Sequence, residues 1–339
     1  MTCKHKKPLG ILLGALIGVA ALLLLIPLGF KLVDLVRHIS FYSVAEATMP
    51  MPGIHDGFIQ QGFDYVTEEK AFLVAGYMKG DDPSRVYVLR EDGSTTVTAL
   101  KKADGKDYTG HTGGIAHFGD YVYITGGKGL DVFSYSEIMA GKESTECLGT
   151  VITYNDPAHC YIVDGHVLVG SFYRPGNYDT EDYQHITTPC GDRNRSIITV
   201  FRLDGAAAFG IDPAVRAVIS TPDQVQGMCV TDKGTVVLST SYGLATSVLL
   251  AYDTEKLPAA ELRDFAGKTE NGDAFSFTSV PYYFLESAAI ADVIEAPPMS
   301  EELVYQNGRI YIMNESASNK YIFGKITSGG SIYAYPYDK

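Results

Sequence analysis

The stretch GHTGGIAHFGDYVYITGG, residues 110–127, carries the pattern on which the fold prediction depends. A histidine and two glycines precede a short apolar segment, a Gly-Asp turn and a strand of alternating apolar side chains. The chain contains five segments of this kind. They open at Gln61, His111, His159, Gln226 and Glu301, so their spacings are 50, 48, 67 and 75 residues.

The segments between these openings are short, rich in Val, Ile, Tyr and Phe, and bounded by turn residues, which is typical of β-strands. Helical periodicity is confined to short pieces such as 136–140 and 258–265. The predicted strands are 71–78, 85–90, 95–100, 121–127, 130–136, 166–173, 196–203, 235–242, 247–253, 309–316 and 331–337.

The repeat spacing predicts an all-β protein with a β-propeller fold. The first two spacings match one blade of four strands, and the longer two leave room for insertions at 173–195 and 256–276. We expect five blades, with six as the alternative. The last group lacks a strand, so a strand from residues 41–55 is expected to complete it and close the ring. Gly113 and Gly114 are expected to let neighbouring backbones approach near the axis.

The N-terminus has a different character. Residues 9–30 contain no charge, and as a helix of about 1.5 Å per residue they are long enough to cross a bilayer. Three lysines precede this run, whereas two basic residues and one acid follow it, and this stronger N-terminal positive charge predicts an N-terminus in the cytoplasm and an exported remainder. A cleaved signal peptide is the alternative, because Ala45-Glu46-Ala47 has the small-x-small form of a cleavage site.

These features predict four parts: a cytoplasmic basic tail (1–8), a transmembrane signal anchor (9–30), a stalk (31–54) and a propeller ectodomain (55–339). The expected location is the cell membrane, with a single pass and the propeller outside. Beyond residue 37 the net charge is −17, which argues against nucleic-acid binding; this acidity either serves solubility alone, which is the simpler interpretation, or suits cations or basic peptides as partners. Four cysteines lie in the exported part and allow three disulfide pairings, among which the sequence does not choose: Cys147, Cys160, Cys190 and Cys229.

Polar residues near the start of each innermost strand should converge at the axis of a propeller. Such a set suits ligand recognition or a hard cation, for which calcium is more natural than zinc because only two candidates are histidines. The alternative is that each side chain only satisfies nearby backbone groups. The candidate channel residues are Gln61, Asp64, His111, His159, Gln226, Glu301 and Glu315.

Glu301 and Glu302 are adjacent in a predicted strand, where successive side chains point to opposite faces. We therefore expect only one of them to face the axis, with Glu315 in the next strand as the source of a second carboxylate. The insertion at 173–195, with its tyrosines and His185, is either a rim that contacts a ligand or variable surface.

Several segments resemble uncharacterised exported propeller proteins of bacteria, over roughly residues 55–320. These are QQGFDY (60–65), YTGHTGGIA (108–116), GSFY (170–173), VQGM (225–228), LSTSYG (238–243), PPMSEE (297–302) and NESA (314–317). The fourth repeat, 225–253, is more remotely similar to the plant-type glutaminyl cyclases, which are five-bladed propellers. The glutamate of that family's second strand has no counterpart near Leu238.

The sequence thus favours a membrane-anchored binding module that takes a peptide, sugar or protein ligand at its axial face. The alternative is an enzyme, a hydrolase or glutaminyl-cyclase-like protein acting on peptides or sugars, with a metal-stabilised channel that holds a calcium ion. Whether the protein is catalytic stays open at this point. The sequence contains no G-x-S-x-G elbow, phosphate loop, dinucleotide fingerprint, HExxH motif or EF-hand loop.

Overall fold

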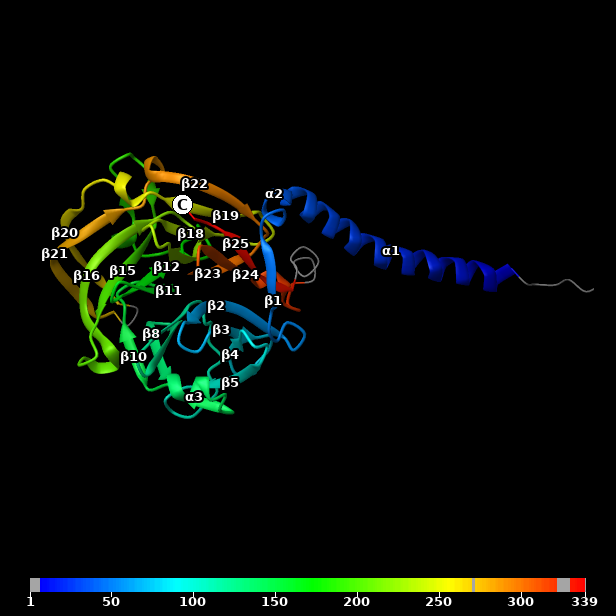
Figure 1. Ribbon diagram of the computed structural model, residues 1–339, viewed down its shortest axis with the longest axis horizontal. Coiled ribbons are helices and arrows are strands. Elements are labelled where there is room, and N and C mark those ends of the chain that lie inside the picture. The colour runs from blue at the N-terminus through cyan, green and yellow to red at the C-terminus, as the bar shows by residue number, and fades with distance from the viewer. Residues whose placement is uncertain (1–6, 270–271, 322–329, 339) are drawn as a thin grey trace, which may run out of the picture.

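Each of the five repeats folds into an antiparallel sheet whose first strand lies nearest a common axis. In the computed structural model, which describes residues 7–269, 272–321 and 330–338, these sheets form the five-bladed propeller of Figure 1. Each innermost strand contacts those of the two neighbouring blades. The predicted fold class is therefore confirmed. Residues 1–6 of the predicted basic tail lie outside the described residues.

The first two blades keep the expected spacing. Blade 1 contains β2 (Phe58–Val66), β3 (Ala71–Met78), β4 (Arg85–Arg90) and β5 (Thr95–Lys101), with β9 (Ser144–Glu146) parallel to β5. Blade 2 contains β6 (Ile115–Phe118), β7 (Tyr121–Gly126), β8 (Gly129–Ser134) and β10 (Gly149–Ile152). The helix α3 (Tyr135–Met139) follows β8, in the first segment with helical periodicity.

The two long insertions both enlarge blade 3. Its four strands are β11 (Pro157–Val163), β12 (His166–Ser171), β15 (Ser196–Leu203) and β16 (Ile211–Thr221), and a small hairpin of β13 (Ile186–Thr187) and β14 (Arg193–Asn194) lies between β12 and β15. The insertion after residue 256 forms a hairpin of β20 (Glu261–Lys268) and β21 (Ala274–Phe284), and β21 pairs in parallel with β16. The helical periodicity at 258–265 is thus overridden by strand pairing in the folded sheet.

The last two blades bring the two ends of the propeller together. Blade 4 contains β17 (Val225–Val230), β18 (Val236–Thr240), β19 (Ser247–Tyr252) and β22 (Ile290–Ala296). Blade 5 contains β23 (Ser300–Gln306), β24 (Arg309–Asn314), β25 (Ser331–Pro336) and β1 (Glu46–Pro50). Because β1 pairs antiparallel with β25, a strand from the N-terminal side closes the ring, as the sequence predicted. Short 3-10 turns occur at Asp182–Gln184, Ala208–Gly210, Thr254–Lys256, Ser287–Ala289 and Glu315–Ala317.

Five apolar clusters fill the interfaces between successive blades. Blades 1 and 2, for example, bury Leu73 and Val122 in one cluster, and blades 5 and 1 bury Met313 and Phe63 in another. Burial of apolar surface is the main favourable term in folding, so these interfaces hold the ring together. The axis itself is left to polar groups.

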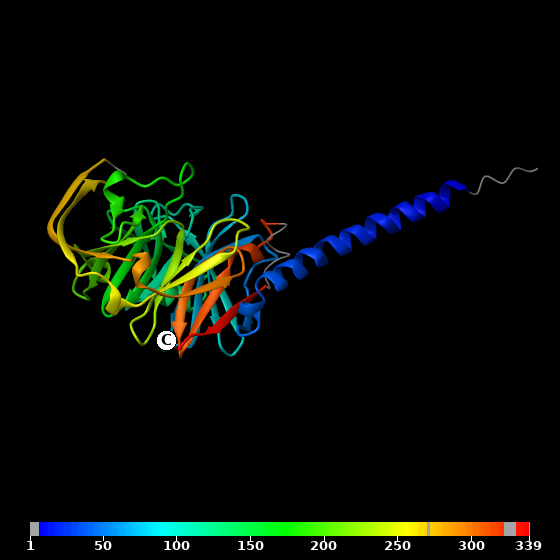
Figure 2. The ribbon, with the colours of Figure 1, turned by 90° about the horizontal axis from the view of Figure 1, so that it is seen from above.

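The helix α1 (Lys7–Arg37) leaves the edge of the propeller near β1, as Figures 1 and 2 show. Within its segment Leu12–Arg37, an 18-residue window has a mean hydropathy of 2.6, so the segment is long and apolar enough to cross a membrane. A second short helix, α2 (Ile39–Tyr42), connects α1 to β1. Residues 31–54, the expected stalk, therefore include the end of α1, all of α2 and the closing strand.

Candidate axial binding site

Glu302, on the innermost strand of blade 5, joins three other blades at the centre of the ring. Its Oε2 accepts hydrogen bonds from the backbone N–H groups of Phe63 (2.6 Å) and Ile115 (3.0 Å). Its Oε1 accepts one from the N–H of Cys160 at 2.9 Å. The side chain is fully buried. One carboxyl group therefore ties blades 1, 2 and 3 to blade 5.

Two features let Glu302 reach this position. The pairing of β23 with β24 is irregular between Ser300 and Leu303, so neighbouring side chains do not alternate strictly there. In addition, glycines allow close approach: a Cβ on Gly114 would lie 2.5 Å from the N of Cys160, and one on Gly227 would lie 2.3 Å from the Cα of Glu302. The expectation that glycines permit close backbone contact near the axis is confirmed.

The charge of Glu302 is subject to two opposing influences. Burial raises the pKa of its carboxyl group well above the usual value, because the charged form loses its hydration. The three N–H donors act in the other direction, since they stabilise the anion. In either protonation state both oxygens can accept hydrogen bonds.

Glu301 and Glu315 form a second acidic centre, beside Glu302. Glu301 is 2% exposed, and no described residue donates a hydrogen bond to its carboxyl group. Glu315 follows β24, and its backbone N–H donates to the carbonyl of Met299 (2.8 Å), which brings it against the start of β23. Burial, followed by the nearby carboxyl groups of Glu315 and Glu302, raises the pKa of Glu301, and burial also raises the pKa of Glu315.

Two tyrosines and a lysine complete this centre. The Tyr321 hydroxyl donates to Oε1 of Glu315 at 2.8 Å, and the Tyr77 hydroxyl donates to the same oxygen at 3.2 Å. The ammonium of Lys320 contacts the Tyr77 hydroxyl and lies 4.8 Å from the centroid of the Tyr77 ring and 5.0 Å from that of Tyr321. An ammonium thus already lies among aromatic rings beside a buried carboxylate.

His111 precedes β6 and lies on the same side of the ring as Tyr77. Its ring is 4.7 Å from the ring of Tyr77. The residue is exposed, but the surrounding protein atoms and the charge of Lys320 lower the pKa of its imidazole to about 4. His111 is therefore a neutral group at neutral pH.

These groups together are called the axial mouth. Gln61 belongs to it because its side chain interacts with Glu315. The members of the axial mouth are Gln61, Tyr77, His111, Glu301, Glu315, Lys320 and Tyr321.

The other candidate residues lie elsewhere. Asp64 follows Phe63 on β2, beyond the Glu302 layer, where its Oδ2 lies 2.6 Å from Nδ1 of His117. His159 is fully buried, its ring fills the space beside Gly170, and burial lowers its pKa to about 3. Neither of its nitrogens has a hydrogen-bond partner among the described residues. Gln226 is half-buried on β17, next to Gly227.

The described residues offer little to a metal ion. No group of three or more His, Cys, Asp or Glu side chains among them forms a metal site. At the centre of the ring, the Glu302 oxygens are occupied by N–H donors. The four cysteines of the propeller carry free thiols, so no disulfide pairing connects them.

Sequence reasoning missed the aromatic and basic part of the axial mouth. Tyr77 lies near the end of β3, the second strand of blade 1, and Lys320 and Tyr321 follow the turn after β24. None of these three residues is near the start of an innermost strand, where the candidate residues were sought. A possible signal was the NESASNKY segment, 314–321, which combines a carboxylate, a lysine and a tyrosine directly after a strand. Loops at strand ends carry such residues in many binding sites.

No protein family and no curated protein matches the sequence. Among solved structures, the chain is similar to the glutaminyl cyclase of Myxococcus xanthus (TM-score 0.41, 11% identity, covering 80% of this chain and 91% of that one). It is also similar to the PQQ-bound aldose sugar dehydrogenase of Streptomyces coelicolor (TM-score 0.43, 13% identity, 86% and 96% covered). A third is a putative 6-phosphogluconolactonase of Bacteroides fragilis (TM-score 0.35, 13% identity, 74% and 63% covered). At these identities the likeness concerns the propeller fold alone.

Proposed function

We propose that this protein is a membrane-anchored propeller that binds a cationic ligand at its axial mouth. The observation that carries the proposal is Glu301, a carboxyl group that is almost fully buried and has no hydrogen-bond donor among the described residues. Burying such a group without a partner is costly, and it is retained most often where it serves binding or catalysis. A ligand cation would supply the missing partner.

The surroundings of Glu301 support an organic cation. Lys320 places an ammonium within about 5 Å of two tyrosine rings, a geometry in which the ring face attracts positive charge. Calcium takes six to eight oxygen ligands, and the two carboxyl groups, the Gln61 amide and two phenols offer a weaker set. The net charge of −17 beyond residue 37 would also attract cations over longer distances. In the proposed arrangement α1 spans the membrane and the propeller lies outside the cytoplasm.

The test is binding of pentalysine to the full-length protein in detergent, measured by calorimetry, with fully acetylated pentalysine as the uncharged probe. We expect Glu301→Gln to weaken pentalysine binding at least fivefold. Glu255→Gln is the matched control, because it removes the same charge from an exposed position far along the chain. Equal weakening by both variants, or equal binding of the acetylated peptide, would show that only the overall charge matters and would overturn the proposal.

The same pair of carboxyl groups supports a second candidate, an acid–base enzyme acting on peptides or sugars. Two carboxyl groups of raised pKa beside two phenols and a neutral imidazole are groups that hold and transfer protons near neutral pH. Turnover of glutaminyl peptides or glycosides by the wild type, absent in Glu301→Gln, would favour this candidate. Binding without turnover would favour the binding module.

A further inference from the structure

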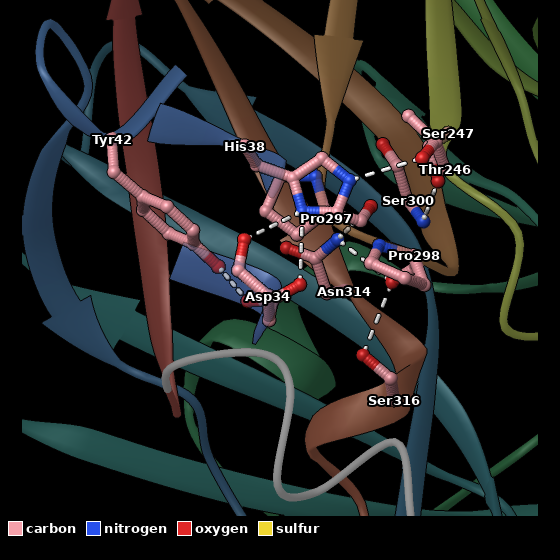
Figure 3. Close-up of polar contacts among 10 residues, drawn as sticks. All are labelled: Asp34, His38, Tyr42, Thr246, Ser247, Pro297, Pro298, Ser300, Asn314 and Ser316. Carbon is pink, nitrogen blue, oxygen red and sulfur yellow. Dashed lines mark hydrogen bonds and ion pairs between the residues drawn. The ribbon is translucent and has the colours of Figure 1, made fainter. Parts of the chain in front are cut away.

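The end of the membrane-spanning helix is fastened to blade 4 by a buried histidine. His38 is 1% exposed, and its Nδ1 lies 2.9 Å from Oδ1 of Asp34, whose Oδ2 accepts a hydrogen bond from the Tyr42 hydroxyl at 2.7 Å. Its other nitrogen, Nε2, lies 3.1 Å from the Oγ1 of Thr246, in the loop between β18 and β19 (Figure 3). This pairing joins residues 208 positions apart and fixes α1 against the propeller.

From Thr246 a buried connection leads to Glu301. The next residue, Ser247, accepts a hydrogen bond at its Oγ from the backbone N–H of Ser300 at 3.0 Å (Figure 3). Ser239 holds Ser300 from a second side, because its hydroxyl lies 3.0 Å from the Ser300 hydroxyl and 3.1 Å from its carbonyl. Ser239, Ser247 and Ser300 are all fully buried. Ser300 directly precedes Glu301.

The opposite side of the same segment is held by the residues around Glu315. The Asn314 amide donates to the carbonyls of Pro297 (3.1 Å) and Pro298 (3.2 Å), and the Ser316 hydroxyl donates to that of Pro298 at 3.1 Å (Figure 3). Between these contacts Met299 has a φ of +60°, a strained conformation that only the surrounding bonds maintain. Residues 297–300 are therefore clamped between the Thr246 loop and the Glu315 turn, and the clamp sets the spacing of Glu301 and Glu315.

We propose that His38, at the end of the membrane-spanning helix, is a positioning residue for Glu301 and acts through Thr246, Ser247 and Ser300. The proposal rests on the proposed function, since Glu301 matters here as the group that binds the cation. It adds that the anchor and the axial mouth are parts of one connected structure. Loss of the His38 contact would free the loop that holds Ser300 and so change the spacing of the two carboxyl groups.

The test is Thr246→Val in the full-length protein, because it removes the hydroxyl that His38 contacts and alters neither the helix nor the mouth. The first readout is hydrogen exchange of the backbone amides in 298–304, and we expect at least a tenfold faster exchange at Ser300. The second is the pH profile of pentalysine binding, whose midpoint should shift because the carboxyl spacing changes. Thr246→Ser restores the hydroxyl and should restore both readouts.

Ser43→Ala is the matched control, since it removes an exposed hydroxyl bond near the same helix end without a contact to blade 4. Unchanged exchange at Ser300 in Thr246→Val, or the same change in Ser43→Ala, would overturn the positioning role. If pentalysine does not bind the wild type, the proposed function fails, and the exchange readout alone still decides whether His38 positions this segment. Faster exchange in Thr246→Val, reversed in Thr246→Ser, would support the positioning role in either case.

Discussion

Replacement of Glu302 by glutamine tests the role of the central carboxyl group. Three backbone N–H groups converge on its two oxygens, two on Oε2 and one on Oε1. A glutamine offers one carbonyl oxygen and one NH₂ group. In its better orientation the carbonyl keeps the bonds from Phe63 and Ile115, while the NH₂ group faces the N–H of Cys160. Two buried donors then lack acceptors.

Each buried donor without a partner costs about 1–3 kcal/mol, so the two donors left by Glu302→Gln should lower the free energy of unfolding by about 2–6 kcal/mol. In a domain of this size that corresponds to a melting temperature lower by about 3–10 °C. The assay is thermal and denaturant unfolding of the full-length protein in detergent, followed by circular dichroism and by tyrosine fluorescence, since the chain contains 23 Tyr and no Trp.

Glu301→Gln provides the matched comparison, because the adjacent carboxyl group is as deeply buried but has no donor among the described residues. A neutral amide there removes the cost of a buried, repelled charge, so stability at neutral pH should be unchanged or higher. A Glu302→Gln protein as stable as the wild type, or less stable only to the extent of Glu301→Gln, would refute the argument that hydrogen bonds to Glu302 hold the blades together.

Three further predictions concern the axis and the helix α2. Gly227→Ala places a Cβ 2.3 Å from the Cα of Glu302, so it should lower the free energy of unfolding, measured in urea, by about 3 kcal/mol. Gly127→Ala is the control, because a Cβ there has no atom within 4 Å, and its free energy of unfolding should stay close to that of the wild type. The pKa of Glu301 is raised above 4.5, so the native state holds more protons than the unfolded chain above that pH, and wild-type stability should fall as the pH rises from about 4.5. A flatter dependence of stability on pH in Glu301→Gln would identify Glu301 as the group responsible. An unchanged slope would exclude it. Phe41 in α2 is 1% exposed, and its ring centroid stacks 5.5 Å from that of Tyr335, so Phe41→Ala should cost about 3–5 kcal/mol. A loss below about 1 kcal/mol would show that α2 is not part of the propeller core.

The fold was predictable because its determinants are local and repeated. Turn residues, β-branched strands and the five openings recur along the chain, and each recurrence independently indicates one blade. The closing strand was also predictable, since the last group lacked a strand and a propeller ring is commonly closed by pairing the two ends of the chain in one blade. The hairpin of β20 and β21 was not, because its pairing with β16 joins residues more than 50 positions apart and overrides a weak helical periodicity.

The site was predictable only in part, for a different reason. Gln61, His111, Glu301 and Glu315 lie on one side of the ring because the innermost strands begin there and the antiparallel second strands end there. Asp64 lies beyond the Glu302 layer, since its position on the innermost strand places it on the far side of Phe63. The argument that only one of Glu301 and Glu302 faces the axis assumes strict alternation, and the irregular pairing of β23 removes that condition. No periodicity of the sequence indicates such an irregularity.

One short segment, residues 297–302, combines the three properties that distinguish this propeller. Glu302 connects the blades, Glu301 supplies the buried carboxyl group of the mouth, and Ser300 is held by Ser247, next to the Thr246 that contacts His38. Because one irregular strand start sets all three positions, a change in its backbone should alter stability and binding together. Changes at Lys320, whose exposed side chain contacts Tyr77 and Tyr321 of the mouth, should alter binding while stability stays the same. That separation identifies the strand start, rather than the loop after β24, as the element that ties the fold to the proposed function.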